Sequence, residues 1–210
     1  MGKGLFISLE GPDGSGKSTQ IEYLKEYFRE LSLECEFTRE PGGTEIGEQI
    51  RRIILDRENR SMADMTEALL YAASRAQHVE EKILPALEAG KVVVCDRYVD
   101  SSIAYQGYGR QMGGQIAEIN AFATGGCMPD LTILISVDPE VGRKRIAAGE
   151  RDRLESEKLR FHKDVYRGYL ELAEQDPERI KAVDGTGTRE AIRDEIRGYV
   201  DRALRSKGLI

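Results

Sequence analysis

The sequence has few of the residues on which disulfide-rich, zinc-binding or membrane-spanning proteins depend. Its 210 residues include 3 cysteines, 2 histidines and no tryptophan, and no two cysteines form a C-x-x-C pair. This excludes a disulfide framework and a zinc knuckle; Cys35 and Cys95 lie in apolar runs and are expected to be buried thiols. No apolar run reaches the about 18 residues that cross a bilayer, and residues 5–9 are too short a run for a signal peptide. We therefore expect a reduced, cytoplasmic protein.

An excess of positive charge is also absent. The chain has 31 lysine and arginine residues against 37 aspartate and glutamate residues, a formal charge of −6. A surface of this sign does not attract nucleic acid or acidic membrane, so we expect neither as a partner, and any anion must be bound locally. There is no internal repeat and no Pro- or Ser-rich linker. We therefore expect one domain over residues 1–210.

Five β-prone runs alternate with helical patterns along the chain. The runs cover residues 5–10, 34–39, 92–96, 131–137 and 180–184. Helical patterns cover residues 20–31, 65–88, 115–124, 140–147 and 189–205. The central runs are continuously apolar, as in strands buried on both faces, so the alternation predicts an α/β fold with a five-stranded parallel sheet flanked by helices. The polar stretch at residues 143–160 is expected to be a mobile surface excursion.

A glycine-rich motif follows the first predicted strand. Residues 11–18 read G-P-D-G-S-G-K-S and match G-x-x-x-x-G-K-[ST] at the start of a predicted helix. Glycines let backbone N–H groups close around phosphate oxygens at a helix N-terminus, where the partial positive charge favours anions. Lys17 would bridge the outer phosphates and the Ser18 hydroxyl would bind Mg²⁺. The candidate nucleotide-binding residues are Gly11, Pro12, Asp13, Gly14, Ser15, Gly16, Lys17, Ser18 and Thr19.

A second motif follows the third predicted strand. Residues 92–98 read V-V-V-C-D-R-Y, and the carboxyl ends of parallel strands face the crevice in which ligands bind. Asp96 would order Mg²⁺ or its waters, while Arg97 would point toward a second anion. One pocket would then hold two phosphate-bearing ligands. The alternative for Arg97 is a structural ion pair at the surface.

Two further segments supply candidates for this crevice. The run T-R-E-P-G-G-T ends the second strand and places Glu40 nearby, with Arg51 a short distance along the chain. Tyr71 and Arg75 are four residues apart on one predicted helix face, so a ring and a planar cation could together bind a base. Ordinary packing beside a surface charge gives the same spacing.

Together these segments closely resemble thymidylate kinases, the P-loop kinases that transfer the γ-phosphoryl group of ATP to dTMP. The resemblance covers nearly the whole chain and is carried by G-P-D-G-S-G-K-S, T-R-E-P-G-G-T, L-L-Y-A-A-S-R-A-Q-H, D-R-Y-V-D-S-S-I-A-Y-Q-G-Y-G-R, P-D-L-T-I-L-I-S-V and R-D-R-L-E. It implies a three-layer P-loop NTPase fold, ATP and Mg²⁺ as cofactors, dTMP as substrate and a homodimer.

The resemblance also implies the residues that contact the acceptor nucleotide. They are Arg51 and Arg97 at its phosphate, Glu40 near that phosphate and the metal, Asp13 and Tyr105 at its sugar, and Tyr71, Arg75, Ser102 and Gln106 at its base. Many members have phenylalanine where this chain has Tyr71. The ring can still stack on thymine, but the additional hydroxyl needs a partner or water.

The catalytic cations follow from the same resemblance. Some members have an arginine where this chain has Gly14, so the likeness is to the bacterial-type branch, which takes its catalytic arginine from a lid. Here the lid is the excursion at residues 143–160, and the motif points to Arg153, with Arg151 next. Lys17, Arg97 and Arg153 are thus the expected catalytic residues, since the acceptor phosphate needs no general base. His78 and His162 are expected to be structural.

Two other functions share the phosphate loop. One is a kinase for another nucleoside monophosphate, which differs at the base-reading set of Tyr71, Arg75 and Ser102. The other is a nucleotide-dependent switch, but the only asparagines, Asn59 and Asn120, do not lie in the N-K-x-D segment that guanine recognition normally requires.

Overall fold

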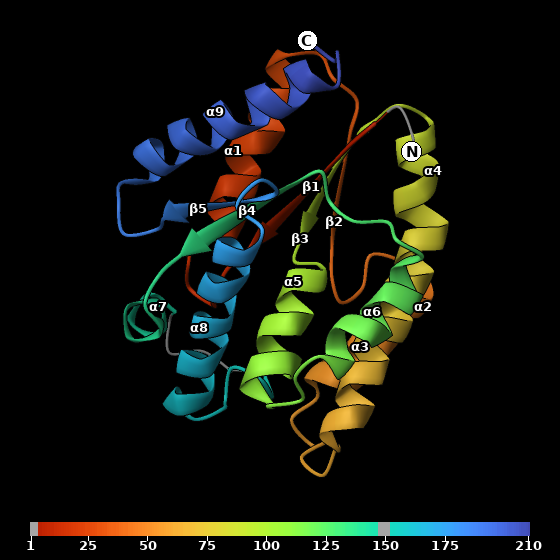
Figure 1. Cartoon of the computed structure of the whole chain (residues 1–210), viewed down its shortest axis with the longest axis vertical. Helices are drawn as coiled ribbons and strands as arrows, with labels where there is room; N and C mark the ends of the chain where they lie inside the picture. Colours follow the sequence, from red (N-terminus) through yellow and green to blue (C-terminus); the bar gives the residue numbers. More distant parts are fainter. Residues whose placement is uncertain (1–3, 147–151) are drawn as a thin grey trace.

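Five parallel strands form a single sheet in the computed structural model, which describes residues 4–146 and 152–210. Their order across the sheet is β2-β3-β1-β4-β5 (Figure 1). The strands are β1 (Leu5–Glu10), β2 (Cys35–Arg39), β3 (Val92–Asp96), β4 (Leu131–Ser136) and β5 (Ile180–Asp184). Every predicted strand is present to within one residue at each end, and the predicted α/β fold with a parallel sheet is confirmed.

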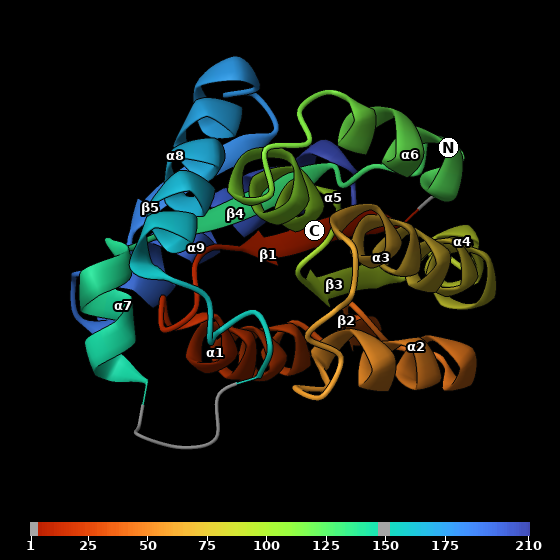
Figure 2. The ribbon, with the colours of Figure 1, turned by 90° about the horizontal axis from the view of Figure 1, so that it is seen from below.

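Helical segments connect the strands and cover both faces of the sheet. They are α1 (Lys17–Glu30), α2 (Glu45–Leu55), α3 (Asp64–His78), η1 (Val79–Ile83), α4 (Leu84–Glu88), α5 (Val99–Ser102), η2 (Ile103–Gly109), α6 (Gln115–Thr124), α7 (Pro139–Arg145), α8 (Leu159–Gln175) and α9 (Arg189–Ser206). Both η segments are π-helical turns. Figure 2 shows α1 on one side of the sheet and α5 and α8 on the other.

The alternation of side chains along β1 builds a core on both faces. Leu5 and Ile7 pack in one cluster with residues of α1 and α9, such as Phe28 and Ile196. Phe6 points the other way and packs with residues of η1 and β3. Because successive residues of a strand face opposite sides, a strand covered on both faces must be apolar throughout.

The predicted helix over residues 65–88 is interrupted. The structure divides this range into α3, the π-helical turn η1 and α4. Pro85 lies in the first turn of α4; it has no N–H to donate, and its ring would clash with the carbonyl of Glu81 in a regular helix. The wider π turn immediately before it accommodates that ring.

Three helical regions lie outside the predicted ranges given above, namely α2, the α5–η2 pair and α8. The excursion predicted at 143–160 contains the end of α7, turns at residues 153–156 and the first residues of α8, besides positions outside the described ranges. The predicted helix over 140–147 ends at Arg145 among the residues that the structure describes.

The three cysteines are free, and only Cys95 is fully buried; Cys35 and Cys127 are half-buried, so the prediction for Cys35 was wrong in degree. Within residues 4–146 and 152–210, no helix has the length and apolarity needed to cross a membrane.

Candidate active site

Three strand ends meet at one edge of the sheet and form the site. The phosphate loop follows β1, the segment beginning at Glu40 follows β2, and Arg97 follows β3. Backbone bonds tie these ends together: the N–H of Glu40 donates to the Asp96 carbonyl at 2.9 Å, and the N–H of Arg97 donates to the Leu9 carbonyl at 2.9 Å. Parallel pairing thus brings together residues far apart in the sequence.

The phosphate loop has the conformation that its glycines permit. Gly14 and Gly16 have φ angles of 77° and 100°, values that L side chains rarely adopt. A Cβ on Gly14 would also lie 2.3 Å from the Gly142 carbonyl oxygen. α1 begins at Lys17, so its first N–H groups face the loop.

Lys17 points back over this loop. Its Nζ donates to the carbonyl oxygens of Gly11 at 2.8 Å and Pro12 at 3.1 Å. Burial, together with the neighbouring Arg97 guanidinium, lowers the pKa of Lys17 to about 8. The charges of Asp13, Asp96 and Glu10 act in the opposite direction but do not outweigh these two effects, and Lys17 forms no ion pair with the described residues, so the amine suits an anionic ligand.

Hard oxygen donors lie beside the loop. The Asp96 Oδ1 atom is buried and accepts no hydrogen bond from the part of the chain that the structure describes. Ser18 and Asp96 line the same groove. A carboxylate oxygen without a partner next to a hydroxyl suits a hydrated Mg²⁺ ion, so these residues fit the predicted metal ligands.

Two hollows adjoin at this edge of the sheet. The phosphate-loop groove is lined by residues 13–20, by Arg39 and Asp96, and by residues of the β5–α9 connection such as Gly185 and Thr188. The inner pocket lies beyond it. All nine residues predicted to contact the acceptor line that pocket, namely Asp13, Glu40, Arg51, Tyr71, Arg75, Arg97, Ser102, Tyr105 and Gln106. Asp13, Glu40, Arg51, Arg97 and Glu155 line both hollows.

Arg97 lies at the junction of the two hollows. Its backbone has a left-handed φ of 68°, a strained conformation for a residue with a side chain. Its Nη2 donates to Asp13 Oδ1 at 2.5 Å, and its Nη1 donates to the Gly11 carbonyl at 3.0 Å. Although burial opposes it, the charges of Arg97 and Lys17 lower the pKa of Asp13 below its ordinary value. Tyr105 donates to the other oxygen of Asp13 at 3.0 Å.

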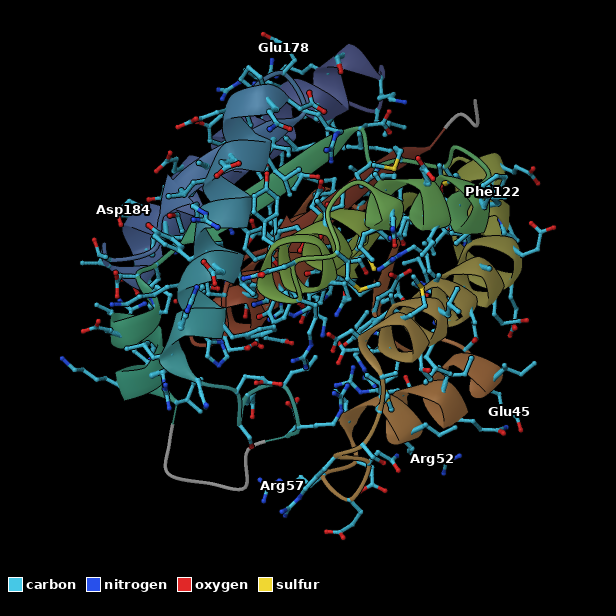
Figure 3. All side chains as sticks on the ribbon, turned by 60° about the horizontal axis from the view of Figure 1, so that its bottom comes forward. Glu45, Arg52, Arg57, Phe122, Glu178 and Asp184 are labelled. Atoms are coloured by element: carbon cyan, nitrogen blue, oxygen red, sulfur yellow. The ribbon has the colours of Figure 1, made fainter. Side chains whose placement is uncertain are left out.

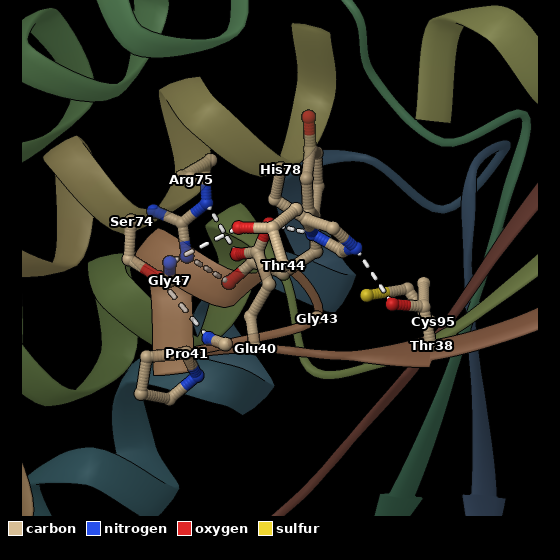
Figure 4. Close-up of polar contacts among 12 residues, drawn as sticks. Thr38, Glu40, Pro41, Gly43, Thr44, Gly47, Ser74, Arg75, His78 and Cys95 are labelled. Carbon is tan, nitrogen blue, oxygen red and sulfur yellow. Dashed lines mark hydrogen bonds and ion pairs between the residues drawn. The ribbon is translucent and has the colours of Figure 1, made fainter. Parts of the chain in front are cut away.

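Glu40 connects the second strand end to α3 (Figure 4). Its Oε2 accepts from Arg75 Nε at 2.7 Å, and its Oε1 lies 2.9 Å from His78 Nδ1. The other nitrogen of His78 lies 2.7 Å from Thr38 Oγ1. His78, which was expected to be structural, thus helps to hold Glu40 in place. Although Glu40, His78 and Cys95 are close enough to surround a metal ion, the Glu40 oxygens and His78 nitrogens are already engaged.

Arg75 is buried at 1% exposure and is held from several sides. Its Nη1 donates to Ser102 Oγ at 3.0 Å and to Asn120 Oδ1, and its Nη2 donates to the Tyr98 carbonyl at 3.1 Å. Tyr71 lies one helical turn earlier on α3 and is half-buried. Burial raises the pKa of the Tyr71 hydroxyl, which stays protonated.

The structure does not bring Arg153 to the phosphate loop. Its Nη1 lies 2.7 Å from Glu67 Oε2, and its Nε donates to the Ile54 carbonyl at 2.8 Å. Arg151 lies outside the described residues. Arg145 instead lines the phosphate-loop groove, where it donates to the Gly185 carbonyl at 2.9 Å.

Sequence reasoning missed several members of the site, among them Glu10, Ser101 and Tyr169. Glu10 is fully buried and accepts from the Tyr98 N–H at 2.7 Å, from Ser101 Oγ at 2.5 Å and from Tyr169 OH at 3.2 Å. Ser101 and Tyr169 both contact Arg97 Nη1. Burial and the charge of Asp100 raise the pKa of Glu10 to about 7. An acid at the end of an apolar run was a usable signal for Glu10, whereas no local pattern marks Tyr169.

Comparison with known proteins shows which family the chain resembles. The family model described as thymidylate kinase matches residues 9–196. Thymidylate kinase from Clostridium novyi is 48% identical over 204 residues, covering 95% of this chain and 100% of that protein. The one from Lactobacillus delbrueckii subsp. bulgaricus is 54% identical over 189 residues, covering 88% and 89%. The crystal structure of thymidylate kinase from Ehrlichia chaffeensis matches with a TM-score of 0.77 at 31% identity, covering 94% of this chain and 98% of that one.

Proposed function

This chain belongs to the thymidylate kinase family, and from that premise we propose that it transfers the γ-phosphoryl group of ATP to dTMP with Mg²⁺, yielding ADP and dTDP for dTTP synthesis. The observation that carries this proposal is the junction of the phosphate-loop groove and the inner pocket at Asp13 and Arg97. A triphosphate in the groove and a monophosphate in the pocket would there face each other with their reacting oxygens close together.

The phosphate end binds and aligns the two nucleotides. Lys17 would give up its hydrogen bonds to the loop carbonyls and bind the outer phosphates of ATP instead. The backbone of residues 11–19 would surround these phosphates. Arg97 and Arg51 would bind the acceptor phosphate, with Glu40 beside it. Ser18 and Asp96 would hold Mg²⁺, which, when bound, neutralises charge on the transferred group. The acceptor oxygen is anionic, so alignment and charge neutralisation suffice.

The other end of the inner pocket selects the nucleoside. Asp13 would accept a hydrogen bond from the sugar 3′-hydroxyl, and Tyr105 would line the sugar. Tyr71 would stack on thymine. The polar edge of the base would face Arg75, Ser102 and Gln106, all of which line the pocket.

We propose that the chain is a single domain with a lid at residues 143–160. Arg153 remains our candidate for the catalytic cation that this lid contributes. Because the structure pairs it with Glu67, this role requires it to exchange that partner for the transferring phosphoryl group.

A second copy of this chain is the partner we propose for the exposed apolar side chains of α2, α3 and α6. They are Ile46, Ile53, Met65, Leu69 and Phe122, with exposures between 40% and 90%. α2 packs on α3, and α3 packs on α6, so the three helices form one face, from which Phe122 projects at the rim of the molecule (Figure 3). Such a face suits a homodimer in the cytoplasm. Sedimentation equilibrium of wild type and L69K measures the oligomeric state, and we expect L69K to weaken the dimer.

A coupled ADP-release assay with a panel of nucleoside monophosphates tests the proposed function. We expect strong stimulation by dTMP over UMP, CMP and AMP. Stimulation by another monophosphate instead would assign the chain to a different acceptor, and no stimulation by any acceptor would favour a nucleotide-dependent switch.

A further inference from the structure

A buried carboxylate at the start of α3 contacts Gln106, a residue that lines the inner pocket. Glu67 is 1% exposed. Its Oε2 accepts from Arg110 Nη2 at 3.1 Å and lies 2.7 Å from Arg153 Nη1. Its Oε1 accepts from Gln106 Nε2 at 2.8 Å. Burial alone would raise the pKa of Glu67, but the hydrogen bonds from Arg110 and Gln106 outweigh it and leave the pKa below its ordinary value.

This contact fixes the orientation of the Gln106 amide. An ionised carboxylate only accepts hydrogen bonds, so the NH₂ group of Gln106 must face Glu67, and its carbonyl oxygen must point away. Gln106 lines the inner pocket. No residue in the described ranges donates to Gln106 Oε1, so this oxygen is available to a ligand as an acceptor whose orientation is set by the protein.

The pyrimidine bases differ where this acceptor would meet them. Thymine and uracil have a donor, N3–H, between two carbonyl oxygens, whereas N3 of cytosine is an acceptor beside an amino group. An acceptor held in place forms a hydrogen bond with the first and repels the second. If the amide could turn by 180°, it would offer N–H instead and the distinction would be lost.

We propose that Glu67 is a positioning residue that selects N3–H pyrimidines over cytosine by holding the Gln106 amide in one orientation. The proposal rests on the proposed function, because it needs the acceptor base to lie in the inner pocket. Glu67 as a mere anchor for Arg110 and Arg153 is the competing explanation. Only the positioning role makes base selectivity depend on the acceptor-only chemistry of residue 67.

Two substrates and two matched variants separate these explanations. dTMP and 5-methyl-dCMP have the same sugar, phosphate and methyl group and differ at N3 and C4. In E67Q, the new amide can present either end to Gln106, so the ratio of kcat/KM for dTMP to that for 5-methyl-dCMP should fall about tenfold. E157Q makes the same change at another partner of Arg110, whose Nη1 lies 2.6 Å from Glu157, without contacting Gln106. Its ratio should equal that of wild type.

An equal loss of activity toward both substrates in E67Q, with the ratio unchanged, would overturn the proposal, as would an equal fall of the ratio in E157Q. If E67Q does not fold because Arg110 and Arg153 lose a carboxylate, the double variant E67Q/R110Q balances the charge and is compared with R110Q. Wild-type enzyme that does not phosphorylate dTMP at all would instead refute the proposed function, so the two failures are distinguishable.

Discussion

The inner pocket and the phosphate-loop groove differ in how their polar groups are satisfied. In the inner pocket, Arg75 is paired with Glu40 and donates to Ser102, and Glu40 also contacts His78. In the groove, the buried oxygens Ser15 Oγ and Asp96 Oδ1 have no partner among the described residues, and Lys17 makes hydrogen bonds there only to backbone carbonyls. The polar groups of the pocket are thus held by the protein itself, whereas those of the groove suit charged ligands.

The largest effect is expected from R97A, which removes one of the two arginines, Arg51 and Arg97, that line both hollows. We expect kcat/KM for dTMP to fall about a thousandfold, a size typical of a lost electrostatic contact in phosphoryl transfer. The ATP dissociation constant should change only a few-fold, because the loop and Lys17 remain. Steady-state kinetics and calorimetry measure the two quantities, and an equal loss of both ligands would contradict the assignment of Arg97 to the acceptor.

In the buried network of Glu40 and Arg75, the main effect should be on stability. E40Q leaves the buried Arg75 without its counter-charge, so we expect the free energy of unfolding to fall by about 3 kcal/mol. E48Q is the matched control, since Glu48 pairs with Arg39 at the exposed surface and should cost less than about 1 kcal/mol. Urea unfolding measures both, and equal losses would mean that the Glu40 network is not the organising element.

A smaller effect is expected from R153A, which tests whether Arg153 contacts the phosphoryl group during its transfer. If Arg153 contacts the phosphoryl group mainly in the transition state, kcat should fall about tenfold with little change in either KM. R110A is the control, because Arg110 also pairs with Glu67 but has no proposed contact with the phosphates. Unchanged turnover in R153A would remove this residue from the mechanism.

The smallest effect is expected at Glu10, whose hydrogen-bond partners Ser101 and Tyr169 also contact Arg97. Its pKa of about 7 in the folded protein exceeds the ordinary value of 4.5, so the folded state binds more protons between these values. The stability contributed by this group is therefore present below about pH 4.5 and is lost as the pH rises toward 7. In E10Q the decline in unfolding free energy from pH 5 to 7 should be smaller, by on the order of 1 kcal/mol. Parallel profiles for wild type and E10Q would refute this account.

The sequence predicted the sheet well because the central strands are nearly continuous apolar runs and all five strands alternate with helical patterns. It also predicted the pocket residues that lie in contiguous motifs next to strand ends, such as Asp13, Glu40 and Arg97. Helix boundaries were less predictable where one proline redirects the chain, as at Pro85. The partners of site residues were the hardest to predict: Asn120 meets Arg75 across 45 positions and Tyr169 meets Arg97 across 72. Such contacts depend on the tertiary arrangement and leave no periodic trace in the sequence.

The ion pair between Asp13 and Arg97 has a consequence for which molecules can enter. A doubly charged phosphate can compete with one carboxylate for the guanidinium and free Asp13 to receive a sugar hydroxyl. An unphosphorylated nucleoside has no anion that could replace Asp13 at Arg97, so the Asp13 carboxylate would stay bound to the guanidinium in the place of a phosphate. The Asp13–Arg97 ion pair would therefore favour phosphorylated over unphosphorylated nucleosides.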